Sequence, residues 1–175
     1  LAWYATPGNI RNIELQKQLN ERFGFEGVIG NSPSMHTVVA RLRQIAPTSA
    51  SVLITGESGT GKELVAKALH NNSPRRYKPL VALNCAALPE QLLESELFGH
   101  VRGAFTGAES TKMGLLEAAH TGTVFLDEVG KTSLFMQGKL LQFLDSSEVR
   151  PVGSNEFHKV DVRVICASKS DLRRE

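Results

Sequence analysis

Residues 56–63, GESGTGKE, combine three glycines with a lysine between the short apolar run SVLIT (51–55) and the helix-like run KELVAKALH (62–70). This spacing matches G-x-x-x-x-G-K in its required strand–loop–helix context. Glycines let successive N–H groups point inward, the helix N-terminus adds its positive dipole end, and Lys62 adds a point charge. We therefore predict a triphosphate-binding loop rather than a chance Gly-rich turn. Its residues are Gly56, Glu57, Ser58, Gly59, Thr60, Gly61, Lys62 and Glu63.

A second acidic site follows from TVFLDE (123–128). Glu63 stands where a Ser or Thr hydroxyl normally contacts Mg²⁺, so the ion needs another protein ligand. Asp127 and Glu128 end a run of apolar and β-branched residues, and ligands of open parallel sheets bind beyond the carboxyl ends of the strands. Asp127 can hold Mg²⁺ and Glu128 can polarise a water. The alternative, an exposed acidic pair that ends a strand, is disfavoured by the phosphate loop.

Strand-like and helix-like segments alternate along the rest of the chain, which predicts an α/β fold with a parallel sheet covered by helices on both faces. Ser32 is the expected N-cap of an amphipathic helix. The expected strands are 51–55, 81–84, 124–127 and 160–168. The expected helices are 9–23, 32–47, 62–70, 89–99, 113–120 and 133–145.

Length and composition narrow the class of protein. The 175 residues suffice for one domain, and a net charge of +2 gives no basic footprint of a DNA-binding domain. Cys85 and Cys166 form no Cys-x-x-Cys pair, and the five histidines have no metal-ligand spacing. No apolar run has membrane-spanning length, and no signal peptide is evident. We expect a cytoplasmic protein with reduced thiols and no membrane partner.

The motifs together resemble the AAA+ ATPase domain of sigma-54-dependent transcription activators, the bacterial enhancer-binding proteins. The resemblance covers residues from about 27 to the C-terminus. It comprises VIGNSPSM, VLITGESGTGKELVAKALH, NCAALPEQLLESELFGH, GAFTGA, GTVFLDEVG and VDVRVICAS. It implies an AAA+ core over 27–175, preceded by a segment 1–26 of uncertain role.

The resemblance also implies roles for single residues. The phosphate loop (Walker A) would hold ATP, Val28 and Ile29 would begin the adenine pocket, and in the second acidic motif (Walker B) Asp127 would be the magnesium ligand. Glu128 would be the catalytic base. Asn84 matches the residue that holds this glutamate in an inactive pose until the nucleotide state changes.

GAFTGA would contact sigma-54 through Gly103, Ala104, Phe105, Thr106, Gly107 and Ala108. Its glycines permit unusual backbone angles, and Phe105 offers one compact apolar ring to a partner surface. Nucleotide-dependent changes near Asp127 and Glu128 would move this loop through the intervening helices. Residues 148–155, EVRPVGSN, would form a neighbouring second loop.

Several positions depart from the family pattern. Lys169, a candidate catalytic residue, replaces the sensor asparagine: a lysine can still pair with phosphate but cannot accept a hydrogen bond, so this departure bears on hydrolysis and not on ATP binding. Val101 replaces the usual glutamate before GAFTGA, and Lys131 lies near a helix start. The chain ends at Glu175, before the family's arginine fingers, helical lid and DNA-binding domain, so we expect very slow hydrolysis or none from this polypeptide alone.

The N-terminal YATPGNIRNI resembles the family's lid motif but precedes the phosphate loop. A Pro-Gly turn before a helix, with Arg11 exposed, is favoured over a rearranged fragment in which Arg11 reaches ATP.

Intact relatives act as rings that use ATP hydrolysis to remodel a closed promoter complex. The first alternative function is an ATP-binding module that contacts sigma-54 without turnover. The second is another AAA+ remodeller such as a protease-associated unfoldase, against which GAFTGA counts heavily.

Overall fold

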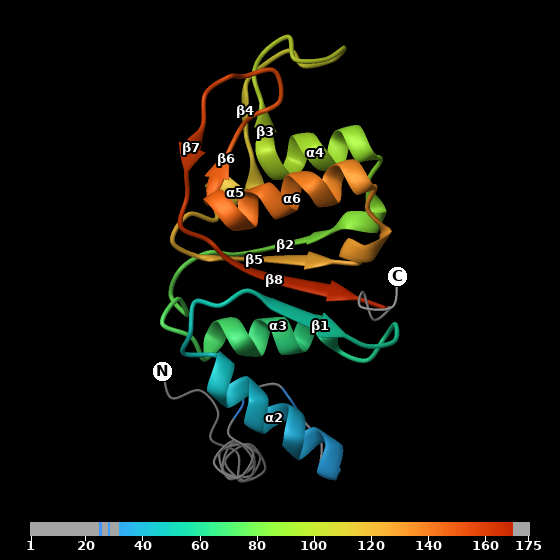
Figure 1. Cartoon of the computed structure of the whole chain (residues 1–175), viewed down its shortest axis with the longest axis vertical. Coiled ribbons are helices and arrows are strands. Elements are labelled where there is room, and N and C mark those ends of the chain that lie inside the picture. Colours follow the sequence, from blue (N-terminus) through green and yellow to red (C-terminus); the bar gives the residue numbers. More distant parts are fainter. Residues whose placement is uncertain (1–24, 26–27, 29–31, 170–175) are drawn as a thin grey trace, which may run out of the picture.

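The computed structural model describes Phe25, Val28 and residues 32–169. Its centre is a parallel sheet with the strand order β1-β8-β5-β2 (Figure 1). These strands are β1 (Val52–Thr55), β2 (Leu80–Asn84), β5 (Thr123–Asp127) and β8 (Arg163–Ser168). The ladder pairs Thr55 with Ser168 and Asn84 with Asp127, so all four strands end at one edge of the sheet. The predicted parallel sheet is confirmed.

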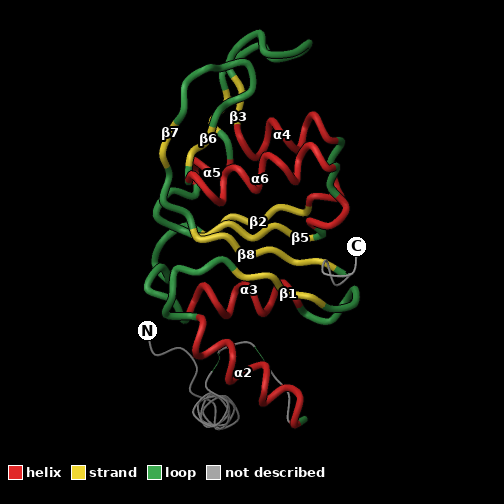
Figure 2. The backbone as a smooth tube through the Cα atoms, viewed as in Figure 1, coloured by secondary structure: helices red, strands yellow, loops and turns green. Residues whose placement is uncertain are grey.

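Helices cover both faces of this sheet, as predicted (Figure 2). Helix α3 (Lys62–Asn71) lies on one face, with α2 (Pro33–Ile45) packed beyond it. Helices α4 (Glu90–Phe98), α5 (Leu115–Ala118) and α6 (Leu134–Ser146) lie on the other face. The predicted cap of α2 is formed, because the Ser32 hydroxyl accepts a hydrogen bond from the Met35 N–H at 3.3 Å.

The alternation of side chains along β5 divides the core into two clusters. Phe125 packs on the α3 face with Ile165 of β8, whereas Val124 and Leu126 pack on the α4 and α6 face. Successive strand residues point to opposite faces, so an unbroken apolar run is the pattern that a strand buried on both faces requires.

Two predicted boundaries are wrong. The helix expected over 113–120 begins only at Leu115. Met113 instead belongs to a short antiparallel pair, β3 (Gly99–His100) with β4 (Lys112–Met113). The backbones approach so closely here that a Cβ on Gly114 would lie 2.5 Å from the Gly99 nitrogen. The strand expected from residue 160 begins at Arg163. Upstream of it, the Asp161 backbone bonds to Thr121 and His120 instead of to a strand.

The sequence did not indicate several other short elements. They are strands β6 (Glu148–Val149) and β7 (His158–Lys159) and the 3₁₀ helices η1 (Cys85–Ala87) and η2 (Val129–Lys131).

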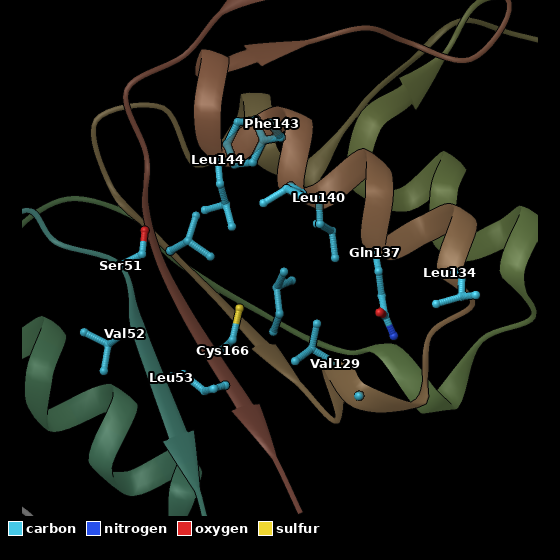
Figure 3. A pocket seen from close by; sticks show the side chains of 14 residues that line it. Ser51, Val52, Leu53, Val129, Leu134, Gln137, Leu140, Phe143, Leu144 and Cys166 are labelled. Atoms are coloured by element: carbon cyan, nitrogen blue, oxygen red, sulfur yellow. The ribbon is translucent and has the colours of Figure 1, made fainter. Parts of the chain in front are cut away.

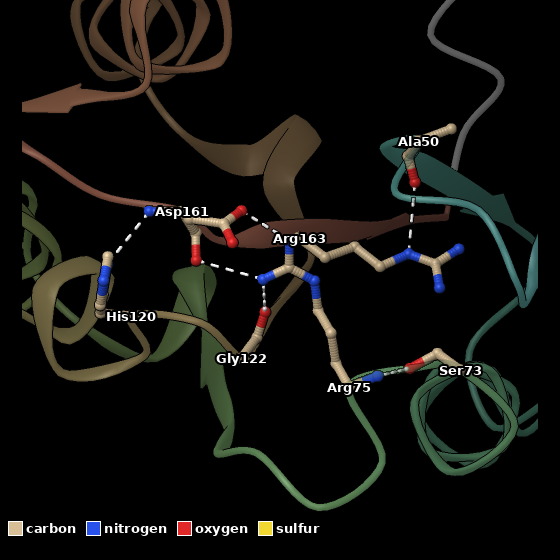
Figure 4. A network of polar contacts seen from close by, with 7 residues as sticks. All are labelled: Ala50, Ser73, Arg75, His120, Gly122, Asp161 and Arg163. Atoms are coloured by element: carbon tan, nitrogen blue, oxygen red, sulfur yellow. Dashed lines mark hydrogen bonds and ion pairs between the residues drawn. The ribbon is translucent and has the colours of Figure 1, made fainter.

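Two arginines fix the edge of the sheet where the strands begin (Figure 4). Arg163 is 1% exposed, and its guanidinium donates to the carbonyls that end α2 and precede β1, those of Ile45, Ala46 and Ala50. Arg75 donates to an Asp161 carboxylate oxygen at 2.5 Å and to the Gly122 carbonyl at 3.2 Å. This hydrogen bond from Arg75 holds the pKa of Asp161 below its usual value. Both contacts lie at the edge opposite the predicted phosphate loop.

The predicted helix over 9–23, Arg11 of YATPGNIRNI, Ile29 and residues 170–175 fall outside the described residues. Within the described ranges, no helix combines the length and apolar character needed to cross a bilayer.

Candidate nucleotide site and partner loop

The predicted phosphate loop connects β1 to α3 at the edge where the parallel strands end (Figure 1). Gly59 has φ +79° and Gly61 has φ +84°, backbone angles that side-chain-bearing residues adopt only at a cost. The Gly56 N–H donates to the Ser168 carbonyl at 3.2 Å, and the Thr60 hydroxyl donates to the Glu57 carbonyl at 2.7 Å. The loop is therefore a tight turn fastened to the end of β8.

Lys62 is the charged group that this loop encloses. It is 8% exposed, and its Nζ donates to the carbonyls of Gly56 and Glu57, both at 2.9 Å. A buried ammonium needs such partners. Phosphate oxygens could replace these carbonyls as acceptors, and the N–H groups of the α3 N-terminus would lie beside them.

Glu63 follows Lys62 in the first turn of α3, but its carboxylate points outward. It pairs with Lys67 at 2.7 Å on the exposed helix surface. Its side chain therefore does not take the place of the missing Ser or Thr, and only its backbone N–H belongs to the phosphate loop. Ser58 is exposed at the tip of the loop.

Asp127 and Glu128 lie where β5 ends, at the same edge of the sheet. An Asp127 carboxylate oxygen accepts from the Glu128 N–H at 2.9 Å. Glu128 has φ +55° and ψ +37°, a left-handed conformation that is uncommon for a residue other than glycine. Its carboxylate pairs with Lys131, one turn of η2 later, with 3.5 Å between Oε2 and Nζ. Strained backbone of this kind is found at functional sites.

Asn84 ends β2 opposite Asp127, as the register requires. Its side-chain oxygen accepts from the Ala86 N–H at 2.9 Å and caps η1. In this conformation the carboxylate of Glu128 pairs with Lys131 and not with Asn84, so the expected inactive pose stays a prediction for another nucleotide state. Lys169 is exposed and follows Ser168, whose carbonyl holds the phosphate loop.

The donor set at this edge fits Mg²⁺. Magnesium in nucleotide sites binds one or two carboxylates together with phosphate oxygens and waters, so it needs no cage of protein ligands. Asp127 supplies such a carboxylate at the same edge of the sheet as the phosphate loop. Among the residues that the structure describes, no cluster of three histidine, cysteine or acidic side chains could hold a metal by itself.

An apolar pocket of about 550 Å³ lies between α6 and the strands β1 and β8 (Figure 3). Its lining includes Leu53, Leu140, Leu144 and Cys166, and none of the described residues that line it carries a charge. Burial raises the pKa of the Cys166 thiol to about 11. Because phosphates need charged or N–H partners, this pocket is not the phosphate site. Val28, expected to begin the adenine pocket, is buried with α2 and α3 on the other face of the sheet.

Residues 103–108, here called the Phe105 loop, project from the β3–β4 pair away from the sheet (Figure 1). Gly103 has φ +80° and Gly107 has φ +97°. The Gly103 N–H donates to the Ala108 carbonyl at 2.9 Å, and the Ala108 N–H donates to the Phe105 carbonyl at 3.0 Å. Phe105 is half-buried and Thr106 is exposed. The structure thus separates the predicted site residues into a phosphate edge and a distant loop.

Sequence reasoning missed the contacts that tie these two regions together. Helix α4 runs from η1, beside Asn84, to the base of the Phe105 loop. Glu96 of α4 pairs with Lys112 of β4 at 2.5 Å, and Glu94 of α4 pairs with Lys139 of α6. The opposite charges at these positions were visible in the sequence, but nothing in their spacing indicated the pairs.

A family model described as Sigma-54 interaction domain matches residues 28–175. The chain belongs to the Sigma-54 interaction domain family. It is 50% identical over 163 residues to the Nif-specific regulatory protein of Azotobacter vinelandii, and 54% identical over 147 residues to the transcriptional regulatory protein GlrR of Escherichia coli K12. These matches cover 93% and 84% of this chain but 31% and 33% of the relatives, so the chain spans about a third of their length.

A solved structure of NtrX from Brucella abortus in complex with ADP superposes with a TM-score of 0.76 at 35% identity. The match covers 90% of this chain and 34% of NtrX, which was also crystallised with ATP. This member of the Sigma-54 interaction domain family therefore has the AAA+ P-loop NTPase fold, and the predicted fold class is confirmed.

Proposed function

We propose that this chain is the ATP-binding core of a sigma-54-dependent transcription activator and that its Phe105 loop contacts sigma-54. One observation carries the proposal: the Lys62 ammonium and the Asp127 carboxylate both lie at the edge of the sheet where the parallel strands end. A cation and an acid beside a glycine loop suit a triphosphate bound with Mg²⁺. The nucleotides crystallised with NtrX support the same ligand class.

Each residue at this edge has a defined part in the proposal. Lys62 would turn from the loop carbonyls to the outer phosphates, and Asp127 would hold Mg²⁺, which would neutralise charge on the phosphates. Glu128 orients a water toward the terminal phosphate and accepts its proton. Asn84 takes hold of the Glu128 carboxylate in one nucleotide state and releases it in another. The adenine would lie near Val28 and Ile29.

Helix α4 provides a route by which nucleotide could act on the loop. Its first turn follows η1, which Asn84 caps, and its last residue precedes β3. The ion pairs of Glu94 and Glu96 tie α4 to α6 and β4. A displacement at the phosphate edge would therefore move α4 and the base of the Phe105 loop together. Assembly into a ring and remodelling of a promoter complex are parts of this proposal.

A second candidate function is ATP binding with sigma-54 contact but without turnover. Two observations favour it: Glu128 is held by Lys131, and the exposed Lys169 stands in place of an amide side chain. Both would leave nucleotide affinity intact and lower the hydrolysis rate.

Binding and turnover of ATP separate these two functions. Titration with a fluorescent ATP analogue and Mg²⁺ is expected to show binding that Lys62→Ala weakens by tenfold or more and that Glu128→Gln leaves unchanged. Single-turnover hydrolysis that Glu128→Gln abolishes, however slow, would support the first function, whereas intact binding without any hydrolysis would mean that this chain by itself behaves as the second function describes. Absence of nucleotide binding would contradict both.

The sigma-54 contact needs its own test. Immobilised sigma-54 is expected to retain the chain and to lose most of it with Phe105→Ala. Tyr77→Ala is the matched control, because Tyr77 is an aromatic residue with 85% exposure outside the Phe105 loop. Equal retention of Phe105→Ala and the unmodified chain would refute the contact.

A further inference from the structure

The Phe105 ring rests on another aromatic side chain, although the loop that carries it is rich in glycine. The rings of His100 and Phe105 lie 5.0 Å apart between centroids with an interplanar angle of 65°. This edge-to-face arrangement is favourable for aromatic pairs. His100 ends β3 and is 8% exposed, whereas Phe105 is half-buried, so His100 is the more buried member of the pair.

The His100 ring is itself fixed from the other side. Its Nδ1 lies 2.7 Å from the hydroxyl of Ser95 on α4, and Ser95 is 4% exposed. A buried hydrogen bond of this kind sets the orientation of the imidazole. None of the phosphate chemistry uses either residue. The chain of contacts runs from α4 through Ser95 and His100 to Phe105.

The second loop, residues 148–155, contacts the backbone on both sides of His100. The Val101 N–H donates to the Val152 carbonyl at 3.1 Å, and the Val152 N–H donates to the Gly99 carbonyl at 2.9 Å. A Cβ on Gly153 would lie 2.7 Å from the Ala104 Cβ, so the Gly153 backbone packs closely against the Ala104 methyl group and the two loops are in contact. The latch that Val101 makes uses its backbone and therefore survives the absence of the family's usual glutamate.

We propose that His100 is a positioning residue for the sigma-54 contact: its ring, oriented by Ser95 and carried on backbone that the second loop holds on both sides, keeps Phe105 in the geometry that sigma-54 meets. The inference rests on the proposed sigma-54 contact. A preorganised ring loses less conformational freedom on binding than one on a free glycine loop. Loss of the edge-to-face contact should weaken sigma-54 binding roughly two- to tenfold.

Short-time hydrogen exchange tests the positioning without sigma-54. His100→Ala is expected to accelerate exchange in a peptide covering the Phe105 loop, whose amides at Gly103 and Ala108 are hydrogen-bonded, while α4 stays protected. His100→Phe with Ser95→Ala keeps an aromatic edge without an unpaired hydroxyl and should restore slow exchange. His120→Ala, an exposed histidine near Asp161, is the control.

Sigma-54 affinity measured on the same variants completes the test. His100→Ala should weaken binding, the double variant should restore it, and nucleotide affinity should stay unchanged in both. If Phe105→Ala weakens binding but His100→Ala does not, or if the double variant exchanges as fast as His100→Ala, this inference is wrong and the proposed function stands. If Phe105→Ala has no effect on sigma-54 binding, the proposed contact fails whatever the exchange data show.

Discussion

Replacing Lys131 with alanine removes the ammonium group that lies 3.5 Å from the Glu128 carboxylate. The Glu128 side chain is 14% exposed and the Lys131 side chain is 59% exposed, so water screens the pair. A pair of this kind contributes about 0.2–1 kcal/mol. If Lys131 restrains the base, Lys131→Ala should raise the rate of ATP hydrolysis by roughly 1.5- to 5-fold, the rate equivalent of that energy. ATP affinity should not change.

The assay is single-turnover hydrolysis of γ-labelled ATP with protein in excess, with Glu128→Gln as the zero. Lys131→Arg keeps the charge and should behave like the unmodified chain. Added salt screens exposed pairs, so salt should raise the rate of the unmodified chain and change that of Lys131→Ala less. A rate that is unchanged or lower in Lys131→Ala would refute the restraint.

Three further predictions concern stability and reactivity. Gly114→Ala should destabilise the fold by about 1–3 kcal/mol in urea unfolding, because the new Cβ would lie 2.4–2.5 Å from backbone atoms at the end of α4. Gly138→Ala, whose Cβ would meet no atom within 4 Å, should stabilise α6 by about 0.5–1 kcal/mol. Equal changes in the free energy of unfolding for the two variants would contradict this packing. Burial raises the pKa of Cys85 to about 12 and of Cys166 to about 11, so both thiols should react slowly with Ellman's reagent at pH 8 until guanidinium is added, and fast native reaction would be the contrary result. Burial lowers the pKa of His70 below its ordinary 6.5, so the unfolded chain binds a proton at a pH where the folded chain does not. The free energy of unfolding should therefore fall as the pH drops below about 6.5. If His70→Gln shows the same fall, this explanation is wrong.

The sequence predicted the parts of the site that depend on local chemistry. An apolar run, glycines and a lysine determine β1, the phosphate loop and the start of α3 within a few residues of each other. Asp127 was predictable at a strand end because the apolar residues before it have to be buried. In both cases the chemical signal and the secondary-structure signal lie in the same segment.

The contacts that the sequence did not predict depend on tertiary packing. Strands β3 and β4 have two residues each, too few for a periodic pattern, and the close approach at Gly114 decides their pairing. The partner of Glu128 follows from a single turn of η2. Arg163 lies inside the run 160–168 that the sequence predicted as a strand, and nothing in that run indicated that its side chain would be buried against the end of α2.

Nucleotide bound at the phosphate edge is expected to change how the distant Phe105 ring meets sigma-54. The direct measurement is the affinity of the chain for sigma-54 with and without a non-hydrolysable ATP analogue and Mg²⁺, compared between the unmodified chain and Lys62→Ala. We expect the analogue to change the affinity of the unmodified chain for sigma-54 and to leave that of Lys62→Ala unaltered. Equal affinity of the unmodified chain in both conditions, with the analogue shown to be bound, would contradict it.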